Sequence, residues 1–329
     1  MTGTQPSRGM SDPGDTLHYA TPLPLHAEYF PMGQSLRIAA NSRLVHAAAE
    51  SIWSRFRCIS NESQVSFHVE IDSGHSRDRV AAPILRAREH LFSIIADSRN
   101  FVNADLRAGF AYAHFTHDLV ADADYWRYHF LEPLAYLLVG ARFFTYLHAS
   151  SVSRYGRAVV LCGDSGAGKT CLAFACARRG WTFHSGDATA ILRSDVRRIM
   201  GRPFEIRFRG DARALFKELR HFPPALRPNN KHDIEIDPVH LGLKIEPEAL
   251  ASHIVFLNRT RVPVKASITP FPPDEARRRL EQDICFGDET IREAQRAALV
   301  AFLSLPVWQL NYSDWDEAEQ SLHALVAEG

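Results

Sequence analysis

The strongest constraint on the fold is a loop of eight residues, Gly163-Asp164-Ser165-Gly166-Ala167-Gly168-Lys169-Thr170, which matches the pattern GxxxxGK[ST]. That pattern acts as a phosphate loop only between a strand and a helix. The apolar run 157–162 predicts a buried strand, and residues 169–179 predict a helix that Gly180 ends. The sequence therefore predicts an α/β fold whose core surrounds this loop.

The residue types of the loop explain what it can bind. Its glycines let several backbone N–H groups converge at the positive end of a helix, where an anion is stabilised. Lys169 can reach the β and γ phosphates, and the Thr170 hydroxyl can ligate the Mg²⁺ that bridges them. We therefore predict that residues from Gly163 to Thr170 bind ATP, with Mg²⁺ as the accompanying ion.

Composition excludes some partners and leaves others open. The 329 residues are enough for two domains. Because 38 basic and 38 acidic residues cancel, no net charge favours nucleic acid or a membrane surface. Five cysteines without CxxC spacing indicate free thiols. The expected partners are a peptide, a protein or a small molecule.

Two segments of the sequence bear on where the protein is expected in the cell. Residues 1–20 are polar, which predicts a loose tail and no secretory signal. The most apolar stretch, 130–147, contains Glu132, Pro133 and Arg142, so we expect a buried helix rather than a membrane span. A cytoplasmic protein is expected.

The segment 21–125 is expected to be a small N-terminal α/β domain, suited to substrate recognition. Alternation predicts a half-buried strand at 64–71, and apolar runs at 91–96 and 110–119 predict more of the sheet. Asn41 is expected to cap a helix through Phe56. The predicted apolar stripe of that helix consists of Leu44, Ala48, Ile52 and Phe56.

The segment 126–329 is expected to be the nucleotide-binding domain, with a mixed sheet and flanking helices. Helices are expected near its start, at 122–141. Further strands are predicted at 204–209 and 254–258. Helices are predicted at 273–284, at 289–303 and from about residue 314.

Residues on both sides of the loop give the chain a family resemblance. His148 begins the segment HASSVSRYG fifteen residues before Gly163, and the helix is followed by GWTFHSGD, which ends at Asp187. Further on, the chain contains the segment Glu205-Ile206-Arg207. Together these features resemble the HPr kinase/phosphorylase family over about residues 143–210.

The resemblance implies an ATP-dependent hydroxyl kinase, although the chain departs from the family pattern. The family has paired aspartates where this chain has Gly186-Asp187, and the N-terminal half has no visible counterpart. HPr is therefore not the expected acceptor. The chain is similar to HPr-kinase-related proteins, which implies serine or threonine of a peptide or protein as the acceptor. Because the family forms hexamers, the resemblance also implies a homo-oligomer.

Asp187 and His148 are the candidate groups for handling a proton. A carboxylate at the end of the strand beside the loop can ligate Mg²⁺ or accept the proton of a hydroxyl. His148 can orient or deprotonate the acceptor, or neutralise the transferring phosphate. The alternatives are a turn aspartate and a structural histidine.

Glu205 and Arg207 are candidates for metal binding and for stabilising charge. Glu205 could be a further metal-linked carboxylate, and Arg207 could stabilise charge on the transferring phosphoryl group. The alternative is a solvated strand face, because Glu205, Arg207 and Arg209 alternate with apolar residues.

Three other functions remain open. The same core could phosphorylate a small molecule. Phosphoenolpyruvate carboxykinases share a similar loop, but their other site residues cannot be placed on this chain. The third is a nucleotide-binding regulator with impaired catalysis. It is favoured by the presence of Gly186 where the family has an aspartate.

Overall fold

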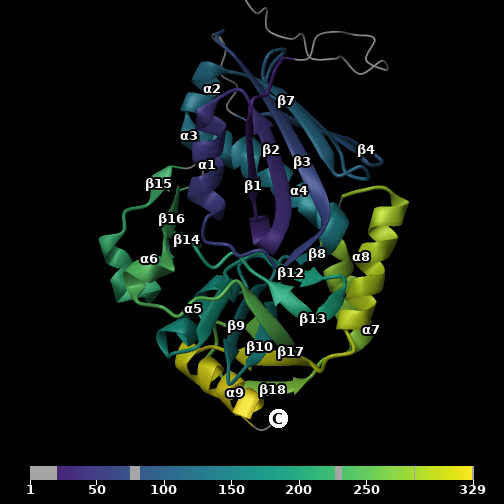
Figure 1. Ribbon diagram of the computed structural model, residues 1–329. Helices are drawn as coiled ribbons and strands as arrows, with labels where there is room; N and C mark the ends of the chain where they lie inside the picture. Colours follow the sequence, from purple (N-terminus) through teal and green to yellow (C-terminus); the bar gives the residue numbers. More distant parts are fainter. Residues whose placement is uncertain (1–20, 75–81, 227–231, 285, 328–329) are drawn as a thin grey trace, which may run out of the picture.

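The computed structural model describes residues 21–74, 82–226, 232–284 and 286–327. It has a mixed α/β fold in two parts, one above the other in Figure 1. The upper part is formed by the described residues up to Phe143, and the lower part contains the glycine loop Gly163–Thr170. The tail expected at 1–20 lies outside the described residues.

A sheet of seven strands, counted over the described residues, dominates the upper part, as the sequence predicts. Its order is β1-β2-β3-β7-β6-β5-β4, with parallel pairing of β3 to both β2 and β7. The buried side chains of β3 are Val65, Phe67 and Val69, which confirms the alternation predicted there. The strands are β1 (Leu25–Tyr29), β2 (Gln34–Ala40), β3 (Ser60–Asp72), β4 (Ile84–Arg88), β5 (Leu91–Ile95), β6 (Phe101–Asp105) and β7 (Phe110–Thr116), with η1 (Pro31–Gly33) before β2.

Helix α1 (Arg43–Trp53) packs on this sheet, but its cap and its buried face differ from the prediction. The Ser42 side chain caps the helix by accepting from the Leu44 N–H. Asn41 instead bonds both backbone groups of Ile71, so it ties α1 to the sheet. The fully buried residues of α1 are Val45, Ala49 and Trp53. Of the predicted stripe, Phe56 is buried just after the helix and Ala48 and Ile52 are partly buried against the same cluster, whereas Leu44 is exposed.

Helices after β7 complete the upper core. The predicted strand 110–119 ends at Thr116, where α2 (His117–Ala121) begins, followed by α3 (Ala123–Trp126), the π-helix η2 (Arg127–Leu131) and α4 (Glu132–Phe143). The apolar stretch 130–147 is a buried helix only as far as Phe143, and its last four residues form strand β8 (Phe144–Leu147). Buried side chains of α4 share one apolar cluster with the upper sheet. The domain boundary near residue 125 stays a prediction.

The lower part contains a mixed sheet of nine strands within the described residues. Its order is β11-β9-β10-β17-β13-β12-β8, and β19 adds to β17 and β18. Strand β17 pairs in parallel with both β10 and β19. The strands are β9 (Ser150–Arg154), β10 (Arg157–Cys162), β11 (Thr182–Ser185), β12 (Thr189–Leu192), β13 (Asp195–Met200), β17 (Glu248–Arg259), β18 (Ser267–Pro270) and β19 (Val307–Tyr312).

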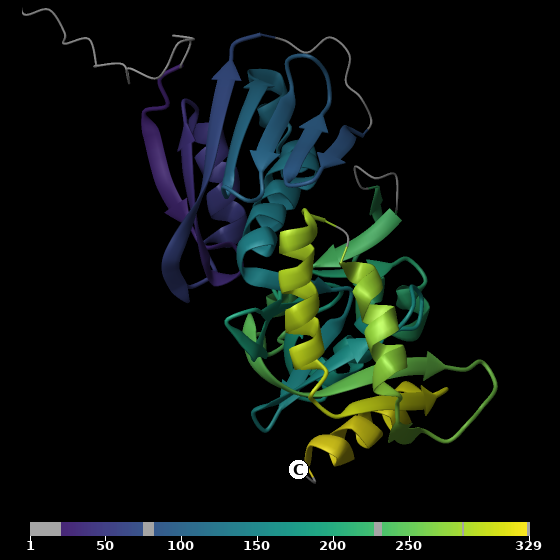
Figure 2. The ribbon, with the colours of Figure 1, turned by 90° about the vertical axis from the view of Figure 1, so that its right-hand side faces the viewer.

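Helices cover both faces of the lower sheet, and β10 has apolar side chains on each. Val159 and Leu161 pack with α5 (Lys169–Arg178) and α9 (Trp315–Ala327), whereas Val160 and Cys162 pack under α7 (Pro273–Leu280) and α8 (Glu289–Phe302). Figure 2 shows α7 and α8 side by side. The helix predicted at 273–284 ends at Leu280 and continues as η5 (Glu281–Asp283). A strand buried on both faces reads as a continuous apolar run, as the sequence of β10 does.

A small third sheet lies beside α5. Its order is β14-β16-β15, formed by β14 (Ile206–Arg209), β15 (Ala225–Leu226) and β16 (His232–Ile236). The strand predicted at 204–209 is therefore confirmed from Ile206 onward. The elements α6 (Ala212–Leu215), η3 (Lys217–His221) and η4 (Pro238–Leu241) complete this region. Among the described residues, no helix combines the length and apolarity needed to cross a membrane.

A buried histidine gives the fold a pH dependence. His184 on β11 is 2% exposed, and its ring nitrogens contact the Glu246 carbonyl at 2.6 Å and the Ser153 hydroxyl at 2.8 Å. Burial lowers the pKa of His184 to about 4. Below pH 6.5 the unfolded chain therefore takes up a proton that native His184 does not bind until about pH 4.

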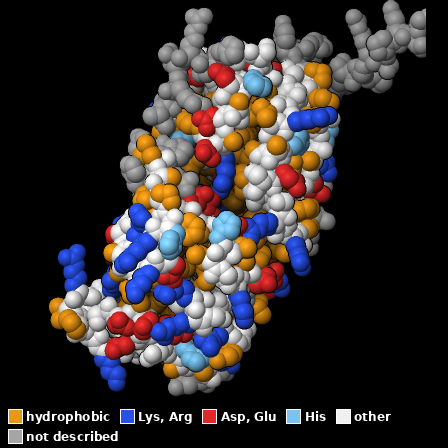
Figure 3. Space-filling model, turned by 90° about the vertical axis from the view of Figure 1, so that its left-hand side faces the viewer, with side chains coloured by type: hydrophobic (Ala, Val, Ile, Leu, Met, Phe, Trp, Pro, Cys, Tyr) orange, Lys and Arg blue, Asp and Glu red, His pale blue; other side chains and the backbone are white. Residues whose placement is uncertain are grey.

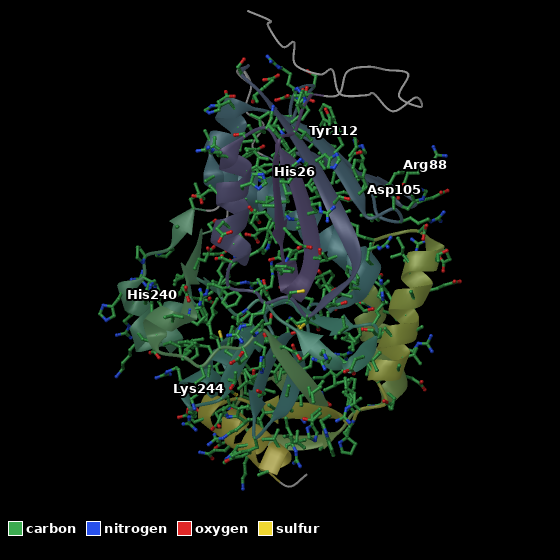
Figure 4. The ribbon with its side chains drawn as sticks, in the orientation of Figure 1. His26, Arg88, Asp105, Tyr112, His240 and Lys244 are labelled. Carbon is green, nitrogen blue, oxygen red and sulfur yellow. The ribbon has the colours of Figure 1, made fainter. Side chains whose placement is uncertain are left out.

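We expect the free energy of unfolding to fall by about 3 kcal/mol from this group as the pH is lowered from 6.5 to 4. Urea unfolding over that range should show a flatter pH dependence for His184→Gln than for the wild type. The control is His240→Gln, because the His240 side chain is exposed at the periphery (Figure 4). Equal slopes for all three proteins would contradict this assignment.

Candidate functional site

The glycine loop follows β10 directly and ends where α5 begins. Gly163, Gly166 and Gly168 have positive φ angles of 147°, 90° and 94°. A side chain at position 168 would also collide with Trp315, since a Cβ there would lie 2.7 Å from the indole ring. Helix α5 starts at Lys169 without a side-chain cap, which leaves the N–H groups of its first turn for a ligand. This geometry suits an anion.

Lys169 is buried and folded back over the loop. Its Nζ donates to the carbonyls of Gly163 at 2.7 Å and Asp164 at 3.2 Å, and the residue is only 6% exposed. Burial lowers the pKa of Lys169 from its ordinary value. Within the described parts of the chain, Nζ forms an ion pair with no carboxylate at up to 4.0 Å. A desolvated cation held only by carbonyls is stabilised by a bound anion.

The Thr170 hydroxyl is held by a backbone carbonyl. It donates to the carbonyl of Gly186 at 2.7 Å, and the Ser150 hydroxyl donates to the same carbonyl at 2.5 Å. Because the proton of Thr170 is used in this bond, the lone pairs of its oxygen remain available. Hydroxyl and carboxylate oxygens are ligands that Mg²⁺ accepts together with substrate phosphates.

The structure brings five of the candidate residues to one cavity, which we call the loop cavity. It has a volume of about 420 Å³ and lies over the glycine loop. Among the described residues, the charged side chains that line this cavity are both basic and acidic, and the basic ones are in excess. The sequence-predicted residues that line it are His148, Lys169, Thr170, Asp187 and Arg207, together with Ser165, Gly166 and Gly168 of the loop.

Asp187 and His148 lie on opposite sides of the loop in sequence. The Asp187 side chain is 48% exposed, and its carboxylate is 3.8 Å from the Arg202 guanidinium. His148 is exposed, and its backbone N–H donates to the Asp283 carboxylate at 2.8 Å. Neither candidate is locked into a close ion pair, so both can serve a ligand. Their catalytic and metal-binding roles stay predictions.

Gly186 occupies a confined position. A Cβ there would lie 3.3 Å from Cγ2 of Thr170, closer than most contacts of this kind. Here the backbone carbonyl of Gly186, rather than a side chain, faces the Thr170 hydroxyl. Of the pair Gly186-Asp187, only Asp187 therefore supplies a carboxylate to the loop cavity, which Asp211 and Asp233 also line.

Glu205 and Arg207 belong to a group of paired charges next to the loop cavity. Arg207 forms ion pairs with Glu205 and Glu235, and Arg127 contacts Glu205 at 2.5 Å and also pairs with Glu132. Burial alone would raise the pKa of Glu205, but a hydrogen bond with Glu235 and the two arginines lower it to about 2. Arg207 lines the loop cavity, whereas Glu205 does not. The metal-binding role of Glu205 stays a prediction.

The sequence-based interpretation missed two further cations at the loop cavity, Arg209 and Arg259. Arg209 Nη2 donates to the Ser165 hydroxyl at 2.9 Å, and the Arg259 guanidinium lies 4.3 Å from the centre of the Trp315 ring. Arg209 follows Arg207 by two positions on β14, and Arg259 ends the parallel strand beside β10. The position of Arg259 could have been predicted, because ligands bind at the carboxyl ends of parallel strands. Arg209 could have been predicted from its alternation with Arg207 on one strand.

A set of three His, Cys, Asp or Glu side chains able to hold a metal ion is absent from the described residues. A Mg²⁺ ion here would therefore need phosphate oxygens as well as the oxygens of Thr170 and Asp187. That combination is the usual one for this ion.

Comparisons with known proteins reveal only a distant similarity. No protein-family model matches it, and no curated protein does. Among solved structures it is similar to the Hpr(Ser) kinase/phosphatase from Coxiella burnetii, with 14% identity, a TM-score of 0.28, and coverage of 56% of this chain and 99% of that one. So low a TM-score does not establish a common fold. The chemistry of the site therefore has to be inferred from this chain's own residues.

Proposed function

We propose that this protein is an ATP-dependent kinase that transfers the γ-phosphoryl group to a hydroxyl. The observation that carries the proposal is the loop cavity, where an uncapped helix start, a buried lysine and a half-exposed aspartate lie together. The cavity's volume of about 420 Å³ is within the range of sites that hold nucleotide-sized ligands.

Each residue has a distinct role in this proposal. Loop N–H groups and Lys169 hold the phosphates, and Thr170 and Asp187 are the protein ligands of Mg²⁺. When bound, Mg²⁺ would neutralise charge that develops on the phosphate oxygens. Arg207 stabilises negative charge on the transferring group, and Asp187 or His148 accepts the proton of the attacking hydroxyl. Positioning and electrostatics supply most of the acceleration.

One observation favours a second function, a nucleotide-binding regulator without turnover. The chain has Gly186 where the family that it resembles has an aspartate, and the space beside Thr170 is narrow. Asp187 is then the single carboxylate at that strand end. Binding of ATP without transfer to any acceptor would identify the regulator.

Removing the Lys169 ammonium tests the nucleotide site. We expect Lys169→Ala to weaken ATP binding about 10- to 100-fold, because a charge-assisted contact to phosphate is worth roughly 1.5–3 kcal/mol. Isothermal titration calorimetry gives the dissociation constants. The matched control is Lys244→Ala, since Lys244 is exposed, labelled in Figure 4 and lines neither of the cavities discussed here. Equal affinities for the wild type and Lys169→Ala would refute the assignment.

Neutralising Asp187 tests the chemical step. We expect Asp187→Asn to lower phosphoryl transfer about 10²- to 10⁴-fold, the usual effect of losing a general base. Binding of ATP without Mg²⁺ should be unchanged, because the amide keeps the shape of the carboxylate. Single-turnover transfer of labelled phosphate measures the rate, with Asp195→Asn on strand β13 as the control. Full activity of Asp187→Asn would exclude Asp187 as the base.

A further inference from the structure

A second cavity adjoins the loop cavity and lies between the two parts of the molecule. We call it the interdomain cavity; its volume is about 260 Å³. The upper part supplies lining residues from the α1 region (Ser51, Ile52, Arg55 and Phe56) and from η2 and α4 (Arg127, Glu132 and Tyr136), and the other lining residues belong to the lower part. Figure 3 shows acidic and basic side chains gathered at a hollow in this face of the molecule. The cavity is therefore a candidate site for a second substrate.

The two cavities share Asp187 and Arg207. These are the residues that the proposed function assigns to the proton and to the transferring phosphoryl group. A molecule in the interdomain cavity would consequently meet the γ-phosphate at the wall that the cavities have in common. This placement is what an acceptor site requires, because the attacking oxygen has to approach the phosphorus beside those two groups.

The charges around the interdomain cavity nearly cancel. Arg55 pairs with Asp237 at 2.6 Å, and Arg202 lies 3.5 Å from Glu132. The lining has four guanidinium groups and five carboxylates among the described residues. A strongly anionic or cationic ligand gains little from such a balance. Hydroxyl groups suit it, because each can donate to a carboxylate and accept from a guanidinium. The charged lining residues are Arg55, Arg127, Glu132, Asp187, Arg202, Glu205, Arg207, Glu235 and Asp237.

Several of these ion pairs are largely removed from water. The Glu132 side chain is 10% exposed, and those of Glu235 and Glu205 are 18% and 21% exposed. Buried ion pairs seldom stabilise a fold more than apolar residues of the same size would. Charges kept at the wall of a cavity are therefore better explained by recognition of a polar ligand than by stability.

Size and aromatic lining narrow the class of ligand. Cavities that hold drug-sized ligands measure about 300–1,000 Å³, so a cavity of about 260 Å³ suits a smaller molecule. Phe56 and Phe204 pack edge to face with ring centres 4.8 Å apart and supply an apolar wall. Alternating polar groups and an aromatic wall match a molecule that has hydroxyl groups on a carbon skeleton.

We propose that the interdomain cavity binds the phosphate acceptor, and that the acceptor is a small polyhydroxylated molecule of little net charge, a sugar or polyol. This inference rests on the proposed kinase function and favours a small-molecule acceptor over a peptide serine. A hydroxyl oxygen of the acceptor forms a bond to the γ-phosphorus, while the bond from that phosphorus to the β–γ bridging oxygen breaks. ADP leaves with the electron pair, and the hydroxyl proton passes to the Asp187 carboxylate.

The test blocks the cavity without removing any of its charges. Ser51 is exposed on α1 and lines the cavity, so Ser51→Trp fills it from the surface. Ala47→Trp is the matched control, because Ala47 is exposed one turn earlier on the same helix and does not line the cavity. The acceptors are glycerol, ribose, glucose and myo-inositol, and a library of serine- and threonine-containing peptides, each with γ-labelled ATP. Calorimetric binding of ATP is measured in parallel.

We expect transfer to at least one of the four polyols, with KM for that polyol raised about tenfold or more in Ser51→Trp and unchanged in Ala47→Trp. ATP affinity should be the same in all three proteins. If Ser51→Trp does not fold by circular dichroism, Arg55→Lys, which keeps the charge but loses the planar fork, should raise the same KM.

Other results would overturn the inference in distinguishable ways. Transfer to peptides alone, or transfer to a polyol that Ser51→Trp and Arg55→Lys leave unchanged, would remove the acceptor assignment and keep the kinase. ATP binding without transfer to any probe would contradict the kinase function itself, and the acceptor site with it. If the wild-type protein did not bind ATP, both the kinase function and the acceptor site would be excluded.

Discussion

A set of ion pairs, partly shielded from water, connects the two parts of this molecule at its candidate site. Arg127 from η2 reaches Glu132 on α4 and Glu205 beside β14, and Arg207 on β14 reaches Glu235 on β16. These ion pairs therefore connect elements from the two parts of the molecule. Removing one partner would leave the opposite charge unpaired and partly shielded from water, which is unfavourable.

These ion pairs also fix the position of Arg207. Its guanidinium is held by Glu205 and Glu235 on one side, and the same residue lines both cavities. A cation with little freedom loses little entropy when charge develops near it. Preorganised charge of this kind is the main means by which kinases accelerate phosphoryl transfer. The network that connects the two parts thus also positions a group for the proposed chemistry.

The loop side of the site depends on backbone contacts rather than on charges. The Gly186 carbonyl accepts bonds from Thr170 and Ser150, which joins the start of α5 to strand β9 and to the end of β11. Gly168 is restricted by the Trp315 ring of α9. Distant segments therefore converge on the loop, although none of these contacts is visible as a motif. The loop, β10 and α5 form one local unit whose conformation its own residues specify.

This difference explains what the sequence could predict. The order of strand, glycine loop and helix follows from local periodicity and glycine positions, as do the strands β3 and β14. The cap at Ser42 and the buried face of α1 depend on packing against a sheet formed by distant residues. The partners of Glu205, the approach of Arg259 and the interdomain cavity likewise arise from tertiary contacts between segments far apart in the chain. The sequence pattern could not show that Glu205 pairs with Arg127 and Arg207.

Phosphorus NMR of MgATP incubated with the wild-type protein and a mixture of hydroxyl-bearing acceptors tests the central claim most directly. If the loop cavity transfers phosphate, the γ-phosphate signal of ATP declines while the signals of ADP and a phosphate monoester grow in equal amounts. A spectrum in which ATP binds but persists, or yields ADP and inorganic phosphate alone, would contradict the account.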